Sequence, residues 1–523
     1  MSYDSFEDFQ YDSCVSRGIC SINPRTSALQ TVLVLYLRLF AKYAIELDLN
    51  KIPAETKNFI LNTVSMTIAN PEFNDNTFLT VINYFRKILS HTIDEYQVLH
   101  ENTSMDEERS KANELFEKTK EIIQAIQYGE KRFQQGQQEL STLIRDLYNI
   151  ILVIAKSLSL NLLDLETFGK THEKGFETIL NLLTRINLGE KDVEILKKEI
   201  CSAVKIDNEL MKHLREAQEE RYGTQDVAEV SYSTVPNKAI LVVGSNIREL
   251  EIILEALKET EIDVYTHDDM MVAHTFPKFS AYKHLKGQFG QGMENCLLDF
   301  STFPGPIILT KHSLHNIENL YRGRLFTTDL TTHKGVINIK NNDFSEVIES
   351  AYQSKGFKTG KNCETVEIGY NFHETIDSIK NRVSNYKRIF LIALEGYSLE
   401  QKVYFEKMLK LLPKENFVIS FSYSLEKENI LHINTCYDSY SMIKIFEEIK
   451  ELSLPITVFV PKCDKNSISQ MIYLTEHKNT EVFVGKCTPI ILNPSLMNTL
   501  QDVFYIKGIS SAKKDLEQIF ENE

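Results

Sequence analysis

Eight cysteines give this chain its most versatile functional groups, because a thiolate binds soft metal ions and a thiol can pair into a disulfide. They stand at positions 14, 20, 201, 296, 363, 436, 463 and 487. Disulfide frameworks are typical of short secreted domains. Here the cysteines are scattered through 523 residues, and no secretory signal precedes them. We therefore expect reduced thiols or metal ligands.

A glycine run, Gly287-Gln-Phe-Gly290-Gln-Gly292, is dense enough in glycine to suggest a phosphate-binding loop. It lacks the preceding strand, the following helix and the lysine of a P-loop, and Gly244-Ser-Asn is no dinucleotide fingerprint. We interpret the run as an ordinary loop. The Cys and His residues also show no spacing typical of a nucleophile and its general base, so no catalytic residue is assigned.

The composition is that of a soluble globular protein, with 42% hydrophobic and 25% charged residues. A formal net charge of −15 and the absence of a dense Lys/Arg block argue against nucleic acid as a partner. The first nine residues are acidic, unlike a signal or transit peptide. The apolar runs Val32–Phe40 and Leu147–Ala155 are far shorter than the roughly 20 residues that span a bilayer. We expect a cytoplasmic protein that binds neither nucleic acid nor membrane.

The first half of the chain has helical spacing of apolar residues from about Thr26 to Glu220. Ser104 and Glu107 form a capping-box pattern that predicts the start of a charged helix running through Lys120. The pattern continues through 143–165 and 179–217. These segments predict an N-terminal helical bundle region.

The second half alternates strand and helix patterns. A linker with Pro236 leads into a buried strand, Lys238–Gly244, and then into a helix starting near Asn246, where Glu249 completes a second capping box. Further strands are expected at 262–265, 306–309, 336–339, 388–393, 417–421, 456–460, 481–484 and 489–492. Further helices are expected at 344–353, 400–412, 440–452 and 467–477. Apolar strands separated by amphipathic helices predict an α/β fold with parallel sheets, and we place domain boundaries to give domains 1–232, 233–372 and 373–523.

Several segments of this half resemble one known family. They are Asp263–His274 (DVYTHDDMMVAH), Phe303–Thr310 (FPGPIILT), Tyr321–Thr328 (YRGRLFTT), Cys436–Ile443 (CYDSYSMI) and Pro489–Leu500. In this order and spacing they resemble the hybrid-cluster (prismane) family, iron-sulfur oxidoreductases related to carbon-monoxide dehydrogenase. The resemblance implies a helical region followed by two Rossmann-like α/β domains, and an ancestral activity of the hydroxylamine or nitric oxide reductase type.

The family's active centre is a four-iron cluster held by one His, two Glu and four Cys, one of them carrying an extra sulfur. By this resemblance Ser245 occupies the His position, Asp269 and Asp464 the two Glu positions, Ser313, Glu395 and Tyr423 three of the Cys positions, and Cys436 the fourth. At the N-terminal cluster the resemblance leaves two of four thiols, Cys14 and Cys20. Ser2 and Ser5 stand where the other pair belongs. Ser, Glu and Tyr do not replace thiolates around bridging sulfides.

The matched residues also have simpler interpretations. Ser245 stands where a helix N-cap is wanted, Cys436 fits a small buried hydrophobe, and Cys14 and Cys20 fit plain thiols. If the fold is kept, the acidic residues and Tyr423 converge in the old cluster cavity. They would then hold a hard cation or mononuclear metal with His267 or His312 nearby, or pair with Lys and Arg in a closed cavity.

We therefore expect a ligand-depleted homologue of the family, a pseudoenzyme without a cofactor that serves as a structural or protein-interaction component. The charged helices around 106–131 are the predicted contact faces for an unknown protein partner. The alternative is an enzyme, a divergent iron-sulfur or mononuclear-metal oxidoreductase that uses Cys436, Asp269, Asp464 and Glu395. An oligomeric state does not follow from the sequence.

Overall fold

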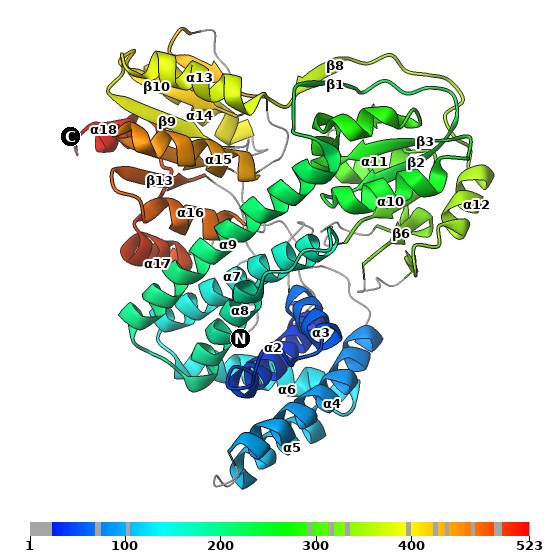
Figure 1. Ribbon diagram of the computed structural model, residues 1–523, viewed down its shortest axis with the longest axis vertical. Coiled ribbons are helices and arrows are strands. Elements are labelled where there is room, and N and C mark those ends of the chain that lie inside the picture. The colour runs from blue at the N-terminus through cyan, green and yellow to red at the C-terminus, as the bar shows by residue number, and fades with distance from the viewer. Residues whose placement is uncertain are drawn as a thin grey trace. The chain divides into compact units, whose positions relative to one another are not determined.

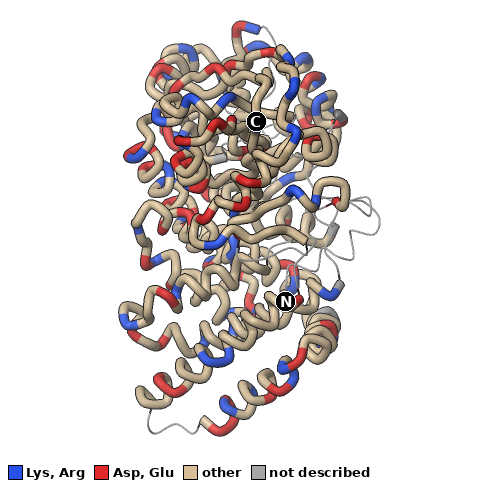
Figure 2. The backbone as a smooth tube through the Cα atoms, turned by 90° about the vertical axis from the view of Figure 1, so that its right-hand side faces the viewer, with Lys and Arg blue, Asp and Glu red and all other residues tan. Residues whose placement is uncertain are grey.

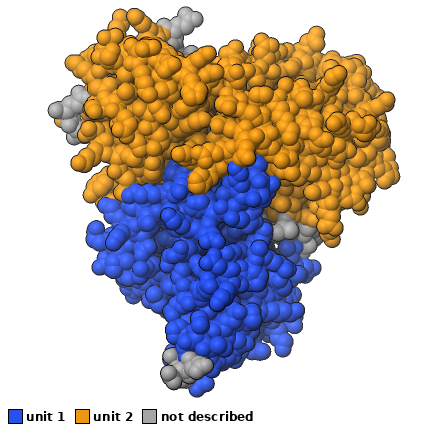
Figure 3. Space-filling view, in the orientation of Figure 1, with its two compact units in different colours: residues 1–211, 330–334, 492–499 blue, residues 212–329, 335–491, 500–523 orange. Residues whose placement is uncertain are grey.

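The chain forms two compact units, which Figure 3 shows in different colours. The computed structural model describes residues 24–67, 75–100, 105–290, 295–311, 313, 318–329, 335–393, 399–421, 427–434, 439–461, 466–485 and 494–521. Unit 1 comprises residues 1–211, 330–334 and 492–499. Unit 2 comprises residues 212–329, 335–491 and 500–523.

Unit 1 is helical, as the sequence predicts. Its helices are α2 (Pro24–Ala44), α3 (Ala54–Ser65), α4 (Asp75–Leu99), α5 (Asp106–Lys118), α6 (Ile122–Glu139), α7 (Thr142–Glu166) and α8 (Glu173–Leu188), and α9 (Val193–Tyr222) continues into unit 2. Among the described residues, α7 alone is long and apolar enough to cross a membrane, but 94% of its most apolar window is buried inside the protein. It therefore packs as a core helix.

Two local features of this unit refine the predictions. Helix α5 begins at Asp106 with Met105 at its N-cap, and the predicted cap, Ser104, lies outside the described residues. Three acidic residues in its first turn instead complement the helix dipole. The predicted segment 179–217 is two helices, because Gly189 ends α8 in a left-handed conformation (φ 71°) that a helix cannot continue.

The first sheet of unit 2 is parallel and doubly wound. Its described strands are β2 (Lys238–Val243), β3 (Ile262–His267), β4 (Leu285–Gln288), β5 (Ile307–Leu309), β6 (Leu325–Thr327) and β7 (Ile337–Asn338), in the order β4-β3-β2-β5-β6-β7. The helices of this part are α10 (Ile247–Leu257), η2 (Asp268–Thr275), η3 (Pro277–Ala281), α11 (Cys296–Thr302), η5 (Arg322–Arg324) and α12 (Ser345–Gln353). Figure 1 shows α10, α11 and α12 beside the strands. The first strand in sequence lies in the middle, beside the fourth, as in dinucleotide-binding folds.

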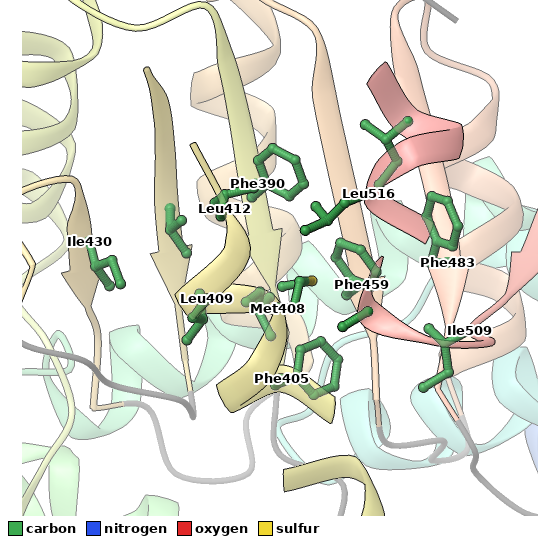
Figure 4. Packing of buried hydrophobic residues seen from close by; sticks show 14 residues of the cluster. Phe390, Phe405, Met408, Leu409, Leu412, Ile430, Phe459, Phe483, Ile509 and Leu516 are labelled. Atoms are coloured by element: carbon green, nitrogen blue, oxygen red, sulfur yellow. The ribbon is translucent and has the colours of Figure 1, made fainter. Parts of the chain in front are cut away.

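The second sheet repeats this topology. Its strands are β9 (Arg388–Ile392), β10 (Asn416–Ser420), β11 (Ile430–His432), β12 (Ile456–Val460), β13 (Thr480–Val484) and β14 (Ile506–Gly508), in the order β11-β10-β9-β12-β13-β14 and all parallel. Its helices are α13 (Phe372–Val383), α14 (Leu399–Leu411), α15 (Ser439–Ile449), η6 (Lys450–Leu452), α16 (Ser467–Thr475), α17 (Pro494–Phe504) and α18 (Ala512–Glu521). Figure 4 shows α14 and α18 packing Phe405 and Leu516 over Phe390, Phe459 and Phe483 of the strands.

The α/β fold class is thus confirmed, with the predicted long strands in place. The predicted strand at 489–492 lies outside the described residues. Interpreting the glycine run as a loop is wrong at its start, because β4 includes Gly287. The linker after residue 226 contains a strand, β1 (Ala228–Ser231), paired antiparallel with β8 (Thr365–Ile368). The domain boundaries at 232 and 372 stay predictions.

Candidate functional site

The positions matched to cluster ligands follow the carboxyl ends of parallel strands. Ser245, Asp269 and Ser313 come after β2, β3 and β5 of the first sheet. Glu395, Tyr423, Cys436 and Asp464, which come after strands of the second sheet along the chain, lie outside the described residues, as do Cys14 and Cys20. In doubly wound sheets, ligands bind at these ends, beside the strand pair where the order reverses. In the first sheet that pair is β2 and β5.

Ser313 is tied into the edge of the sheet. Its hydroxyl lies 3.2 Å from the carbonyl oxygen of Val243, the last residue of β2, to which Thr310 also donates at 2.8 Å. The two hydroxyl oxygens are 3.3 Å apart. A Cβ on Gly244, whose φ is 122°, would lie 2.2 Å from both of them. These hydroxyls therefore fill the space directly beyond the β2–β5 pair.

Ser245 is not the helix cap that the sequence predicts. The N-cap of α10 is Asn246, whose side chain accepts from the backbone N–H of Glu249 at 3.0 Å. The Glu249 carboxylate accepts from the backbone N–H of Lys311 at 2.9 Å and from the Thr328 hydroxyl at 2.6 Å. Burial raises the pKa of Glu249, while the nearby Lys311 ammonium lowers it. One carboxylate thus links the N-terminal turn of α10 to the segments after β5 and β6.

Asp269 lies, partly buried, in η2, and the turn before it is held by a polar network. The side-chain nitrogen of Gln288 donates to the Thr266 hydroxyl at 2.6 Å, and its oxygen accepts from the N–H of Asp268 at 3.1 Å. The Thr266 hydroxyl lies 3.0 Å from Nε2 of His274. Burial lowers the pKa of His274 to about 4, so the ring that shares this hydrogen bond is neutral at pH 7. The network fixes Asp268 in its left-handed conformation, with φ 61°.

His267 forms a buried pair with Asp299, and the sequence analysis had singled out only the histidine. Its ring is fully buried, and Nε2 lies 3.0 Å from the Asp299 carboxylate. Its Nδ1 has no hydrogen-bond partner in the part of the chain that the structure describes. Neither Asp299 nor the nearby Cys296 was predicted, since their helix, α11, spans only seven residues. Burial, with Asp268 and Asp299 nearby, raises the pKa of the Cys296 thiol to about 11, so it stays protonated and is a poor nucleophile.

Arg324 connects two of the motifs that resemble the family, Tyr321–Thr328 and Phe303–Thr310. Its guanidinium donates to the carbonyl oxygens of Phe300 at 2.7 Å, Gly305 at 3.0 Å and Phe303. These carbonyls belong to the end of α11 and to the FPGP turn. Gly305 leaves no room for a side chain, because a Cβ there would lie 2.0 Å from the carbonyl oxygen of Ala239. Both motifs thus have structural tasks in the first sheet.

A model of the Prismane/CO dehydrogenase family matches residues 10–517. The chain belongs to this family.

Its relatives within the family are called hydroxylamine reductases. The chain is 25% identical to the one from Acidiphilium cryptum over 525 residues, covering 96% of this chain and 94% of the relative. It is 24% identical to that of Thermodesulfovibrio yellowstonii over 537 residues, covering 97% of each chain. It is also similar to a solved structure of the alpha subunit of acetyl-CoA synthase/carbon monoxide dehydrogenase, with 12% identity, a TM-score of 0.45, and coverage of 96% of this chain and 83% of that one.

The described positions that the resemblance matches to cluster ligands do not supply the ligands of the iron-sulfur centre that the prismane family implies. If the matching holds, Ser245 and Ser313 offer hydroxyls where the family has imidazole and thiolate. The Ser313 hydroxyl is bonded to Val243 and Thr310 within the sheet edge. Among the described residues, no group of three or more His, Cys, Asp and Glu side chains is arranged to hold a metal ion.

Proposed function

We propose that this chain is a ligand-depleted member of the prismane family, a non-catalytic structural or protein-interaction component. The observation that carries this proposal is the setting of Ser313. At a position matched to a cluster cysteine, a hydroxyl bonds to the Val243 carbonyl and to Thr310, 3.2 Å and 3.3 Å away. The Ser313 hydroxyl stabilises the edge of the sheet, and this position offers no thiolate to bind iron.

The tasks of the retained motifs also support the proposal. Arg324 donates to the carbonyls of the FPGP turn, and Thr266 links Gln288 to His274 behind β3. These contacts stabilise the first sheet whether or not a cluster is present. A family member that is selected for its fold would keep these motifs even after its cluster ligands were exchanged. The chain shows this combination at the positions matched to the ligands.

An interaction role calls for a protein partner, which we place at the charged helices of unit 1. Helix α5 buries only Ala112 and Leu115, so most of its length faces solvent. Lys/Arg and Asp/Glu are interspersed along the chain (Figure 2), which is typical of a solvated surface that can form ion pairs with a partner. The same proposal places the protein in the cytoplasm, without nucleic acid or membrane as a partner.

A second candidate, a mononuclear-metal oxidoreductase, is favoured by His267. Histidines that bind metal through one ring nitrogen usually place the other against a carboxylate. Nε2 of His267 lies 3.0 Å from Asp299, and its Nδ1 has no partner among the described residues. This candidate predicts one metal ion per chain without sulfide, lost in His267→Ala. Metal-free wild-type protein contradicts it.

The activity test compares this chain with the hydroxylamine reductase of Acidiphilium cryptum, purified anaerobically in the same way. With hydroxylamine and a chemical electron donor, we expect turnover from the relative and none above background from this chain. Hydroxylamine-dependent oxidation of the donor by this chain, lost in Cys436→Ala, would overturn the proposal.

A further inference from the structure

A single buried carboxylate on the outer side of the first sheet collects three cationic side chains. Glu251 of α10 is 3% exposed. It accepts from Arg221 at 2.7 and 3.0 Å and from Lys278 at 2.5 Å, and Arg248 also pairs with it. The cations come from three elements, α9, η3 and α10. We call these four residues the Glu251 node.

The carboxylate of the node is saturated with donors. The Tyr222 hydroxyl adds a further hydrogen bond at 3.0 Å. Burial alone would raise the pKa of Glu251, but the hydrogen bonds from Arg221, Lys278 and Tyr222 and the charge of Arg248 outweigh it and bring the pKa to about 2. Glu251 is therefore ionised at neutral pH, and it contributes one negative charge.

Arg221 and Lys278 carry two positive charges against the one negative charge of Glu251. Within the described part of the chain, neither Arg221 nor Lys278 reaches a second carboxylate. Their side chains are 39% and 36% exposed, so solutes can approach them. Cations held within hydrogen-bond distance of one carboxylate also repel one another, and a second anion would relieve that repulsion. In a chain of net charge −15, such a local surplus is unusual.

We propose that the Glu251 node binds a phosphate-type oxyanion through Arg221 and Lys278. The Arg221 guanidinium presents a planar set of N–H donors that matches phosphate oxygens, and the Lys278 ammonium adds a point charge. The bound anion would lie on the solvent side of the cations, opposite Glu251. This site is separate from the strand ends matched to the cluster, and it does not depend on the function proposed above.

The test is isothermal titration of the full chain with inorganic phosphate at constant ionic strength, with chloride as the reference. We expect saturable binding by the wild type. Affinity should fall about tenfold in Lys278→Gln, since a charged hydrogen bond is lost. The matched control is Lys258→Gln, which removes a 61% exposed lysine at the C-cap of α10, paired at 3.8 Å with Glu255, and should leave affinity unchanged.

The variant Glu251→Gln should change phosphate affinity in the opposite direction. It removes the internal negative charge, so phosphate should bind more tightly than to the wild type. If the node is only a structural brace, both Glu251→Gln and Lys278→Gln lower stability and neither changes phosphate binding. No saturable binding by the wild type, or equal affinity in Lys278→Gln and Lys258→Gln, would overturn the proposal.

Discussion

At the residue scale, the motif shared with the prismane family is built mostly from side chains that bond to one another. Thr266, His267 and His274 lie within ten residues, and each has a hydrogen-bond partner in the first sheet or its flanking helix. Burial of His274 makes the ionisation of its imidazole costly. The motif therefore fixes the β3–η2 turn. The sequence alone, which shows only residue types, suggested a metal-ligand position at Asp269 with His267 nearby, and this stays a prediction.

The buried His274 predicts that the stability of the fold depends on pH. Burial lowers its pKa from 6.5 to about 4. Between these values the unfolded chain binds a proton that the folded chain does not, so stability is present above pH 6.5 and falls as the pH drops towards 4. The difference between these pKa values corresponds to a loss of at most about 3 kcal/mol from this one group.

His274→Gln keeps an acceptor for Thr266 but removes the titration. Chemical unfolding between pH 4 and 7 should show a shallower fall in the free energy of unfolding for the variant than for the wild type. His91→Gln, on an exposed histidine paired with Glu95, is the control and should keep the wild-type slope. Equal slopes for His274→Gln and the wild type would contradict a buried, neutral His274.

At the element scale, the strand–helix connections decide what the first sheet can bind. The long apolar strands were predictable, because runs such as Lys238–Val243 and Ile456–Val460 are buried on both faces. The three-residue strands β6, β11 and β14 were not, since so few residues give no periodicity. The contacts of Ser313 also escaped prediction, because they depend on how β2 and β5 pair although residues 244–306 lie between them in the sequence.

A substitution at Gly244 tests how tightly the residues after β2 and β5 are packed. Replacement by Ala would place a Cβ 2.2 Å from the hydroxyls of Thr310 and Ser313, at a φ of 122° that side chains rarely adopt. We expect Gly244→Ala to lower the free energy of unfolding by about 2–4 kcal/mol. Gly323→Ala is the control, since nothing lies within 4 Å of its added Cβ, and it should be nearly neutral. A neutral Gly244→Ala would mean that an open cavity lies beyond β2.

At the scale of the whole molecule, the chain combines a helical unit with two sheets of identical strand order. This fold class and the family were predictable from the order of the motifs between residues 263 and 500, and the family model extends the match to residues 10–517. Whether the active centre holds a cluster was not predictable, because the matched ligands stand in segments far apart in sequence. Four of the seven positions follow strands of the second sheet, and three follow strands of the first.

The central claim, that this family member holds no cluster, is tested most directly by its metal content. Iron and acid-labile sulfide would be measured on anaerobically purified full-length protein, together with its visible absorption spectrum, beside the Acidiphilium cryptum relative. The account predicts a colourless, folded protein without stoichiometric iron or sulfide. Several irons per chain with matching sulfide would contradict it and would mean that the ligands lie elsewhere than at the matched positions.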